Sequence, residues 1–217
     1  MAFVAAAVFW GSGAMAQNKV YIEQVGSSNT VTVTQVGTLN NVGSAATNSK
    51  ITGSNNSLTS SQTGDSNTTN YTIVGSGNTV SKTVLGNTNQ INFTCGDGTT
   101  ACTSVTSSMN ITGDLNTVTS TIKGSNIANT LSITGDSNTV TQTITTNNSS
   151  SSITILGDSN TFTSSMTGTS AGGGHVLIAQ VSGTSNTHNV TQSGSIDTTV
   201  SIITNGNSNN VTVTTGN

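Results

Sequence analysis

Two cysteines are the most reactive side chains in this 217-residue chain. Cys95 and Cys102 bracket a short glycine-containing segment, residues 96–101. In an exported chain, two cysteines this close in sequence can form a disulfide that closes a loop. A thiol metal site is the alternative, but it would need more ligands, and no histidine lies near the pair in sequence. The spacing therefore favours a Cys95–Cys102 disulfide.

Three aspartates are evenly spaced, since Asp114, Asp136 and Asp158 follow one another at intervals of 22 residues. If one interval is one coil of a repeat, the three carboxylates stack about 5 Å apart, and a cation such as calcium could relieve their repulsion. Aspartate is also an ordinary turn residue after glycine, and exposed charges are well screened. The turn role is the simpler interpretation, and the cation site stays open as its alternative.

Catalysis would need acids and bases that converge on a groove, as in the lyases and hydrolases built on long solenoids. Here the few acidic residues fall in predicted turns, and sequence spacing gives neither His175 nor His188 a partner. We therefore assign no catalytic residue and no cofactor, and we do not expect an enzyme.

A repeat carries all of these residues. Residues 24–37 open at Gly26, alternate apolar and polar side chains from Asn29 onward, and close at Gly37, and residues 135–144 repeat that order. Two-residue alternation predicts a strand, and glycine predicts a turn that requires a left-handed backbone. The chain therefore reads as a repeat protein made of strands and turns.

Two strands and two turns give a repeating unit of about 22 residues, in which one corner reads Gly-x-x-Asn in coil after coil. Asparagines at equivalent corners can bond to one another across the roughly 4.8 Å between neighbouring strands. We expect an all-β fold, a parallel two-sheet β-solenoid of about nine 22-residue coils. Alternation should turn Asn138, Val140, Gln142 and Ile144 inward and the intervening threonines outward.

Composition agrees with this fold class. Only 5% of the residues are charged and 3% are aromatic, and proline is absent, so an ordinary globular core is not expected. The net charge of −3 and the many Val, Ile and Thr residues argue against disorder and favour strands that pair with copies of themselves. The four cationic residues are all lysines and form no basic stripe, so nucleic acid is not an expected partner.

Residues 1–16 differ from the repeat, because they are apolar or small and end in Ala14-Met15-Ala16. We expect a secretory signal peptide cleaved before Gln17, with the secretion machinery as a partner. Residues 17–217 would then form a single solenoid domain with a loop insertion at the two cysteines. The apolar run is too short to span a bilayer, so the mature chain should have no membrane span.

The spacing Gln-x-Gly-x-x-Asn-x-Val-x-x-x-Gln in residues 24–35 resembles the curlin repeat of the curli amyloid subunits found in bacterial biofilms, and it recurs in part at residues 180–192. The family pattern would favour glutamine where this chain has Ser60, Lys82, Ser120 and Ser164. The resemblance implies a secreted, extracellular or cell-surface fibre subunit that adds copies end to end in adhesion, biofilm or matrix. It implies copies of itself and related fibre subunits as partners.

The residues expected to form ladders and to support assembly are the corner asparagines together with the glutamines and one glycine of the repeat. They are Gln24, Gly26, Asn29, Gln35, Asn67, Asn89, Asn116, Asn138, Gln142, Asn160, Gln180, Asn186, Gln192 and Asn209. The first and last strands, near residues 19–23 and 210–214, lack proline and carry few charges. Each end can therefore act as a template for another copy.

Two other functions stay open. Outward Thr-x-Thr arrays, such as residues 139–145, are similar to the faces of ice-binding β-solenoids. Strand propensity alone also produces such arrays, and we expect Ser, Asn and Lys82 to interrupt them. A fibrous adhesin on a cell or virion surface is the second alternative.

Overall fold

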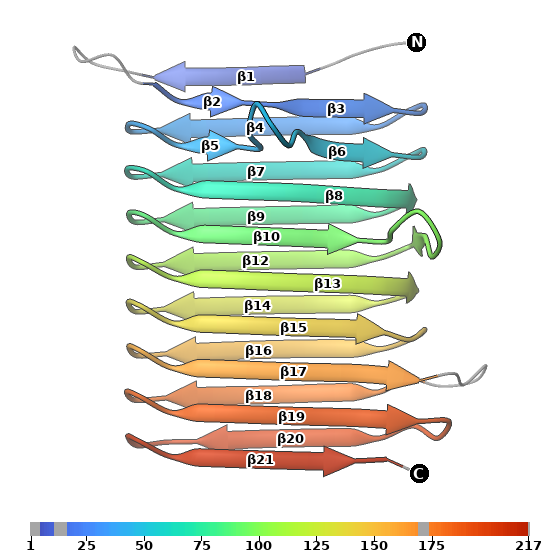
Figure 1. Cartoon of the computed structure of the whole chain (residues 1–217), viewed down its shortest axis with the longest axis vertical. Helices are drawn as coiled ribbons and strands as arrows, with labels where there is room; N and C mark the ends of the chain where they lie inside the picture. The colour runs from blue at the N-terminus through green and yellow to red at the C-terminus, as the bar shows by residue number, and fades with distance from the viewer. Residues whose placement is uncertain (1–4, 11–16, 169–173, 217) are drawn as a thin grey trace.

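The structure is a computed structural model that describes residues 5–10, 17–168 and 174–216. These residues form two parallel sheets wound into a β-solenoid of about eight coils, with about 23 residues per coil (Figure 1). The expected all-β, two-sheet parallel solenoid is therefore confirmed. The described part of the chain contains no helix with the length and apolar character that crossing a bilayer would require.

The first sheet contains nine strands in the order in which they neighbour one another. They are β1 (Ala5–Trp10), β4 (Thr30–Val36), β7 (Ser57–Thr63), β9 (Thr79–Leu85), β12 (Thr106–Thr112), β14 (Ala128–Thr134), β16 (Ser150–Leu156), β18 (Val176–Ser182) and β20 (Thr199–Thr204).

The second sheet contains twelve strands, because three of its levels are split into two short strands. They are β2 (Lys19–Val20), β3 (Ile22–Val25), β5 (Asn41–Val42), β6 (Ser49–Thr52), β8 (Thr68–Ser76), β10 (Gln90–Cys95), β11 (Cys102–Thr103), β13 (Thr117–Ser125), β15 (Thr139–Thr145), β17 (Thr161–Gly168), β19 (Thr187–Gly194) and β21 (Asn210–Thr215). The chain crosses from one sheet to the other after each level, so every coil adds one level to each sheet (Figure 1).

Inserted loops explain why the coils average more than 22 residues. Asn116 and Asn138 occupy equivalent corners 22 residues apart, whereas Asn89 and Asn116 are 27 residues apart. The extra residues of that longer coil lie between β10 and β11, where the chain leaves the sheet and returns. Loops tolerate such insertions because the strand stack on either side keeps its register.

The interior is one residue deep on each sheet and half polar. Asn138, Val140, Gln142 and Ile144 are all buried, as alternation predicts, and the threonines between them face outward. The inward residues Val211 and Val213 are only partly buried, because no further strand of this chain covers the last coil.

Two expectations about inward and outward positions are wrong. Lys82 does not interrupt the outward threonines, because it is fully buried between the sheets. Gln180 does not point inward: Leu177, Ala179 and Val181 take the inward positions of β18 and leave Gln180 exposed on the outer face. The apolar side chains decide the register, since burying them is more favourable than burying an amide.

The signal-peptide cleavage site falls at residues 14–16, which lie outside the described residues. Of the turn insertion expected at residues 171–174, the structure describes Gly174 alone.

Candidate functional site

One corner of the solenoid carries an unbroken ladder of asparagines. This corner, here called the Asn corner, leads from the first sheet to the second. From Asn67 onward each backbone N–H and each side-chain Nδ2 donates to Oδ1 of the asparagine one coil earlier, at 2.9–3.1 Å. The ladder consists of Asn18, Asn40, Asn67, Asn89, Asn116, Asn138, Asn160, Asn186 and Asn209.

Asn116 shows how one rung is satisfied. Its N–H and Nδ2 donate to Asn89 Oδ1 at 2.9 and 3.1 Å, and Nδ2 also donates to the carbonyl oxygen of Gly135 at 2.9 Å. Its Oδ1 accepts both donors of Asn138. A buried amide is costly unless its polar groups are bonded, and these bonds meet that requirement.

The glycines of the Asn corner are required by backbone geometry and by close packing. Gly113 has a φ of +120°, which other residues rarely adopt. A Cβ on Gly113 would lie 2.1 Å from the carbonyl oxygen of Gly135 in the next coil. The glycines therefore allow successive corners to approach closely enough for the asparagines to bond.

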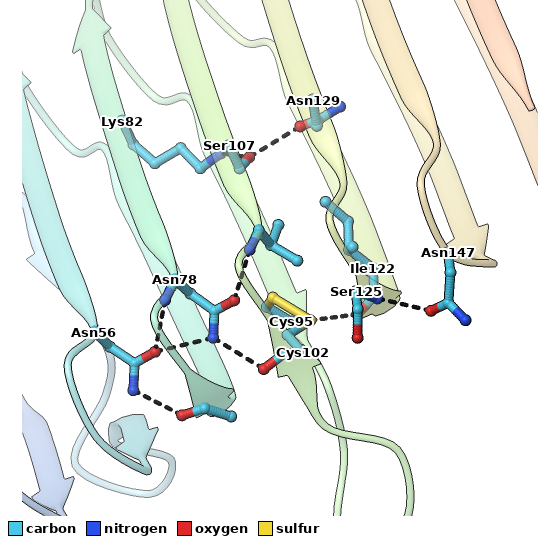
Figure 2. Close-up of a disulfide and its surroundings, with 12 residues drawn as sticks. Asn56, Asn78, Lys82, Cys95, Cys102, Ser107, Ile122, Ser125, Asn129 and Asn147 are labelled. Atoms are coloured by element: carbon cyan, nitrogen blue, oxygen red, sulfur yellow. Dashed lines mark hydrogen bonds between the residues drawn. A yellow bond between two sulfur atoms is a disulfide. The ribbon is translucent and has the colours of Figure 1, made fainter. Parts of the chain in front are cut away.

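The opposite corner carries only a short ladder. Asn56 donates to Asn29 Oδ1 through N–H and Nδ2 at 2.9 and 3.1 Å, and Asn78 donates to Asn56 Oδ1 through Nδ2 at 2.9 Å. Nδ2 of Asn78 also donates to the carbonyl oxygen of Cys102 at 3.2 Å (Figure 2). The next coil has Val105 at this position, so the ladder stops there. Gly26 opens this corner, with a φ of +123°.

The glutamines do not form a continuous ladder. Gln35 donates to Gln62 Oε1 at 2.7 Å, which is a single rung. Gln24 donates to the carbonyl oxygen of Asn29 at 3.3 Å, and Gln192 donates to the backbone of the opposite sheet. Gln142 bonds Asn129 and Ser151 in the first sheet.

Several ladder members were not among the residues assigned from the sequence. They are Asn18, Asn40, Asn56, Asn78 and Gln62. Three of these asparagines follow glycine by three residues, at Gly37, Gly53 and Gly75. The Gly-x-x-Asn signal was therefore present for them in the sequence.

A second ladder lies on the surface of the Asn corner and includes the three spaced aspartates. Oδ1 of Asp114 accepts the backbone N–H of Asn87 at 2.6 Å, Asp136 accepts that of Asp114 at 2.7 Å, and Asp158 accepts that of Asp136 at 2.8 Å. At the equivalent place, Asp65 accepts the N–H and the hydroxyl of Thr38, and these bonds lower the pKa of Asp65.

This surface ladder gives the aspartates a structural role. Asn87 and Asn207 accept backbone N–H groups at equivalent positions, so the acceptor need not carry a charge. Within residues 17–168 and 174–216, no group of three or more His, Cys, Asp or Glu side chains could hold a metal ion. The geometry therefore favours the turn role over the cation site.

A buried lysine starts a chain of polar contacts through the interior (Figure 2). Lys82 Nζ donates to Ser107 Oγ at 2.7 Å, and Ser107 donates to Asn129 Oδ1 at 2.9 Å. Asn129 donates in turn to Gln142 Oε1 at 2.7 Å, and Gln142 bonds Ser151. Burial lowers the pKa of Lys82 to about 7, because the charged form loses its hydration.

Cys95 and Cys102 are joined by a disulfide, with their Cα atoms 5.6 Å apart (Figure 2). The loop that it closes is further held by Asp97, whose Oδ1 accepts the N–H groups of Thr99 and Thr100 at 2.8 and 2.6 Å. Asp97 Oδ2 also lies 2.6 Å from Lys123 Nζ, and this ion pair holds the pKa of Asp97 well below its usual range.

The two histidines are structural in their surroundings. His175 Nδ1 lies 2.8 Å from Thr198 Oγ1, and its Nε2 lies 3.1 Å from the carbonyl oxygen of Thr167. His188 stacks on Phe162 at a centroid distance of 5.8 Å, and burial lowers its pKa. No acidic side chain contacts either ring within the described residues.

The two ends of the stack are where another chain could add. At the C-terminal end, Asn209 donates to Asn186, and its own Oδ1 has no following asparagine among the described residues. At the N-terminal end, Val20 and Ile22 are only partly buried, and Glu23 and Lys50 pair at 3.5 Å beside them. The interior is therefore only partly covered at both ends.

Comparison with known proteins adds one match. No curated protein and no solved structure matches the chain. The family model of the curlin associated repeat matches residues 16–37, a segment that covers β2, β3 and β4. The resemblance drawn from residues 24–35 is therefore confirmed, and residues 16–37 of this chain carry the curlin associated repeat.

Proposed function

We propose that this chain is a secreted structural fibre subunit that assembles end to end by stacking its terminal coils. The observation that carries the proposal is the Asn ladder, which continues from coil to coil without interruption and stops at Asn209 with an acceptor still open. A further copy that placed an asparagine over Asn209 would extend the ladder by the same bonds that hold it within the chain.

Sheet edges support the same proposal. In β21 the inward residues Val211 and Val213 are partly exposed, and the strand contains no charge or proline. An uncovered edge presents unpaired N–H and C=O groups together with apolar side chains, and proteins that stay monomeric usually block such edges. Lys19 and Glu23 are the only charges on the opposite end strands, β2 and β3, and they would slow addition there rather than prevent it.

The curlin associated repeat and the solenoid together support a curli-like fibre subunit and suggest a structural role rather than catalysis. On this proposal the chain is exported, residues 1–16 act as a signal peptide, and the fibre lies outside the cell or on its surface in adhesion, biofilm or matrix. Copies of the chain and related fibre subunits are its partners. Display of the same fibre as an adhesin on a cell or virion is a variant of this function.

Electron microscopy and fibre diffraction test the proposal. At micromolar concentration the purified chain should form filaments with a meridional spacing of about 4.8 Å. Val213→Lys should abolish or strongly slow filament formation, because it puts a charge on the inward face of the last strand. Thr141→Lys, on the outer face of β15, is the matched control and should leave it intact. A chain that stays monomeric at every concentration would rule the proposal out.

Ice binding is a second candidate because of one specific observation. On the outer face of the second sheet, Thr117, Thr139, Thr161 and Thr187 pair in register along neighbouring strands. Lys82 does not interrupt the outward threonines, since it is buried. A regular threonine array can order water, although strand propensity also accounts for it. Thermal hysteresis by the monomer would support this function, and its absence would remove it.

A further inference from the structure

The chain begins in one sheet and ends in the other. Strand β1 pairs with β4 in the first sheet, with Ala5 opposite Val31 and Val8 opposite Thr34. The last strand, β21, lies in the second sheet. With β1 in place, the continuous path of strands has nine levels in each sheet, so the chain contains a whole number of coils (Figure 1).

Removing β1 would break that match at an end-to-end joint. If β21 of one copy pairs with β2 of the next, the second sheet continues without a gap. In the first sheet, β20 of one copy and β4 of the next are then two levels apart, which is roughly twice the 4.8 Å between neighbouring strands. One strand would be missing from the first sheet at every joint.

We propose that this space at the joint is a binding site for one extended peptide segment, and that residues 5–10 are the segment that fills it. This inference rests on the proposed end-to-end assembly and adds the identity of the strand at the joint. A copy that keeps residues 5–10 makes a joint through both sheets, whereas cleavage before Gln17 leaves a joint through the second sheet alone. Processing of the N-terminus therefore sets how firmly copies are joined.

The register of the joint follows from the pairing within the chain. Successive pairings carry the level of Val31 up the first sheet to Val200 and that of Thr34 to Ile203. Because Ala5 pairs with Val31 and Val8 with Thr34, Ala5 would follow Val200, and Val8 would follow Ile203. In the second sheet, Lys19 would follow Asn210 by the same continuation.

Two observations point to a strand at this place. Ile203 on the outer face of β20 is 69% exposed, the largest exposure among the large hydrophobic side chains described. The joint brings Val8 beside it, and covering apolar surface is favourable. At the other side of the joint, Gln35 Oε1 in β4 is buried without a hydrogen-bond partner in the described structure, so the end coil is not complete by itself.

Three double-cysteine variants of the full chain test the joint, since neighbouring strands put paired Cα atoms within disulfide range. Val8→Cys with Ile203→Cys reports β1 against β20 of the next copy. Thr34→Cys with Ile203→Cys reports β4 directly against β20. Lys19→Cys with Asn210→Cys reports the second sheet and serves as the control for end-to-end assembly. The chain is produced without export, intact mass confirms that residues 1–16 are retained, and filaments are oxidised before denaturing electrophoresis.

We expect covalent multimer ladders from the Val8/Ile203 and Lys19/Asn210 variants and none from the Thr34/Ile203 variant. Ladders from Thr34/Ile203, or from Lys19/Asn210 without Val8/Ile203, would overturn the role of residues 5–10 while leaving end-to-end assembly in place. No ladder from any variant and no filaments would overturn both. Filaments of each variant under reducing conditions, compared with the unmodified chain, show that the substitutions have not prevented folding.

Discussion

Lys82 Nζ lies 4.2 Å from the centroid of the Phe93 ring, and both side chains are fully buried. Lys82 belongs to β9 in the first sheet and Phe93 to β10 in the second, so this cation–π contact spans the interior. The hydrogen-bond partner of the ammonium group is the hydroxyl of Ser107, and the described structure pairs Lys82 with no carboxylate. A charge in this place is therefore poorly compensated.

The first prediction is that stability depends on pH through Lys82. Its pKa is about 7 in the folded chain, against about 10.4 in the unfolded chain. Between these values the unfolded chain binds a proton that the folded chain lacks, so the free energy of unfolding should rise from pH 7 towards pH 10 and be lowest below pH 7. Lys82→Met should flatten this slope and stabilise the chain at pH 6 by about 1–4 kcal/mol.

Urea denaturation at pH 6 to 10 measures this slope. Lys50→Met, which removes an exposed lysine, should keep the slope of the unmodified chain. Tyr71 sets the upper limit of the useful range, because burial raises its pKa to about 12 and stability should fall as the pH exceeds 10. Equal slopes for the unmodified chain and Lys82→Met would show that Lys82 is not responsible.

The second prediction concerns the Asn ladder. Asn116→Ala removes two side-chain donors and the acceptor of Asn138, and should cost about 2–4 kcal/mol of unfolding free energy. Asn110→Ala, on the exposed face of the neighbouring strand β12, should change stability by less than about 0.5 kcal/mol. The difference between the two urea midpoints measures the rung, and similar midpoints would contradict its importance.

The third prediction is that corner glycines do not tolerate a side chain. Gly113→Ala should cost more than about 3 kcal/mol, because the new Cβ meets the backbone of the next coil at a positive φ. Gly98→Ala is the matched control, since nothing lies within 4 Å of a Cβ there. Loss of soluble, folded chain by circular dichroism for Gly113→Ala alone is the expected result.

The fourth prediction distinguishes a hydrogen-bond acceptor from a cation ligand at Asp136. Asp136→Asn should be nearly neutral, because Asn87 and Asn207 do the same work in other coils, while Asp136→Ala should cost about 1 kcal/mol. Calcium or a chelator should leave the melting temperature unchanged. A rise with calcium that Asp136→Asn abolishes would restore the cation site.

The fifth prediction concerns the disulfide. Cys95→Ala with Cys102→Ala should cost about 2–3 kcal/mol, since the unfolded chain gains the freedom of the loop that the disulfide closes. The unmodified chain in a reducing agent should match the double variant. Equal urea midpoints with and without the reducing agent would show that the Asp97 contacts hold the loop by themselves.

The sequence predicts the fold and the inward positions well, because both depend on local rules. Alternation alone places Val140 and Ile144 inside, and the glycine of Gly-x-x-Asn alone marks the corner. Gln180 was misplaced because β18 carries apolar residues on both faces, Ile178 among them, so alternation gives no unique phase there. Only stacking against the strands on either side selects one.

The candidate site was predicted less completely, since its bonds join residues from different coils. Lys82 stands two residues after inward Val80, but lysine is so rarely buried that its phase was not trusted. The aspartates could not be recognised as backbone acceptors, because their donors lie one coil away and the coils differ in length. Such partners become visible only when the register is known.

The Asn corner also makes the molecule electrically directional. In every rung the Oδ1 points towards the C-terminal end and receives donors from the following coil, so the amide dipoles align head to tail along the solenoid axis. Aligned dipoles add, as they do along an α-helix, and leave opposite partial charges at the two poles. Each coil stacked in the same orientation lengthens this column, which gives a stack of such molecules a positive pole at its N-terminal end and a negative pole at the other.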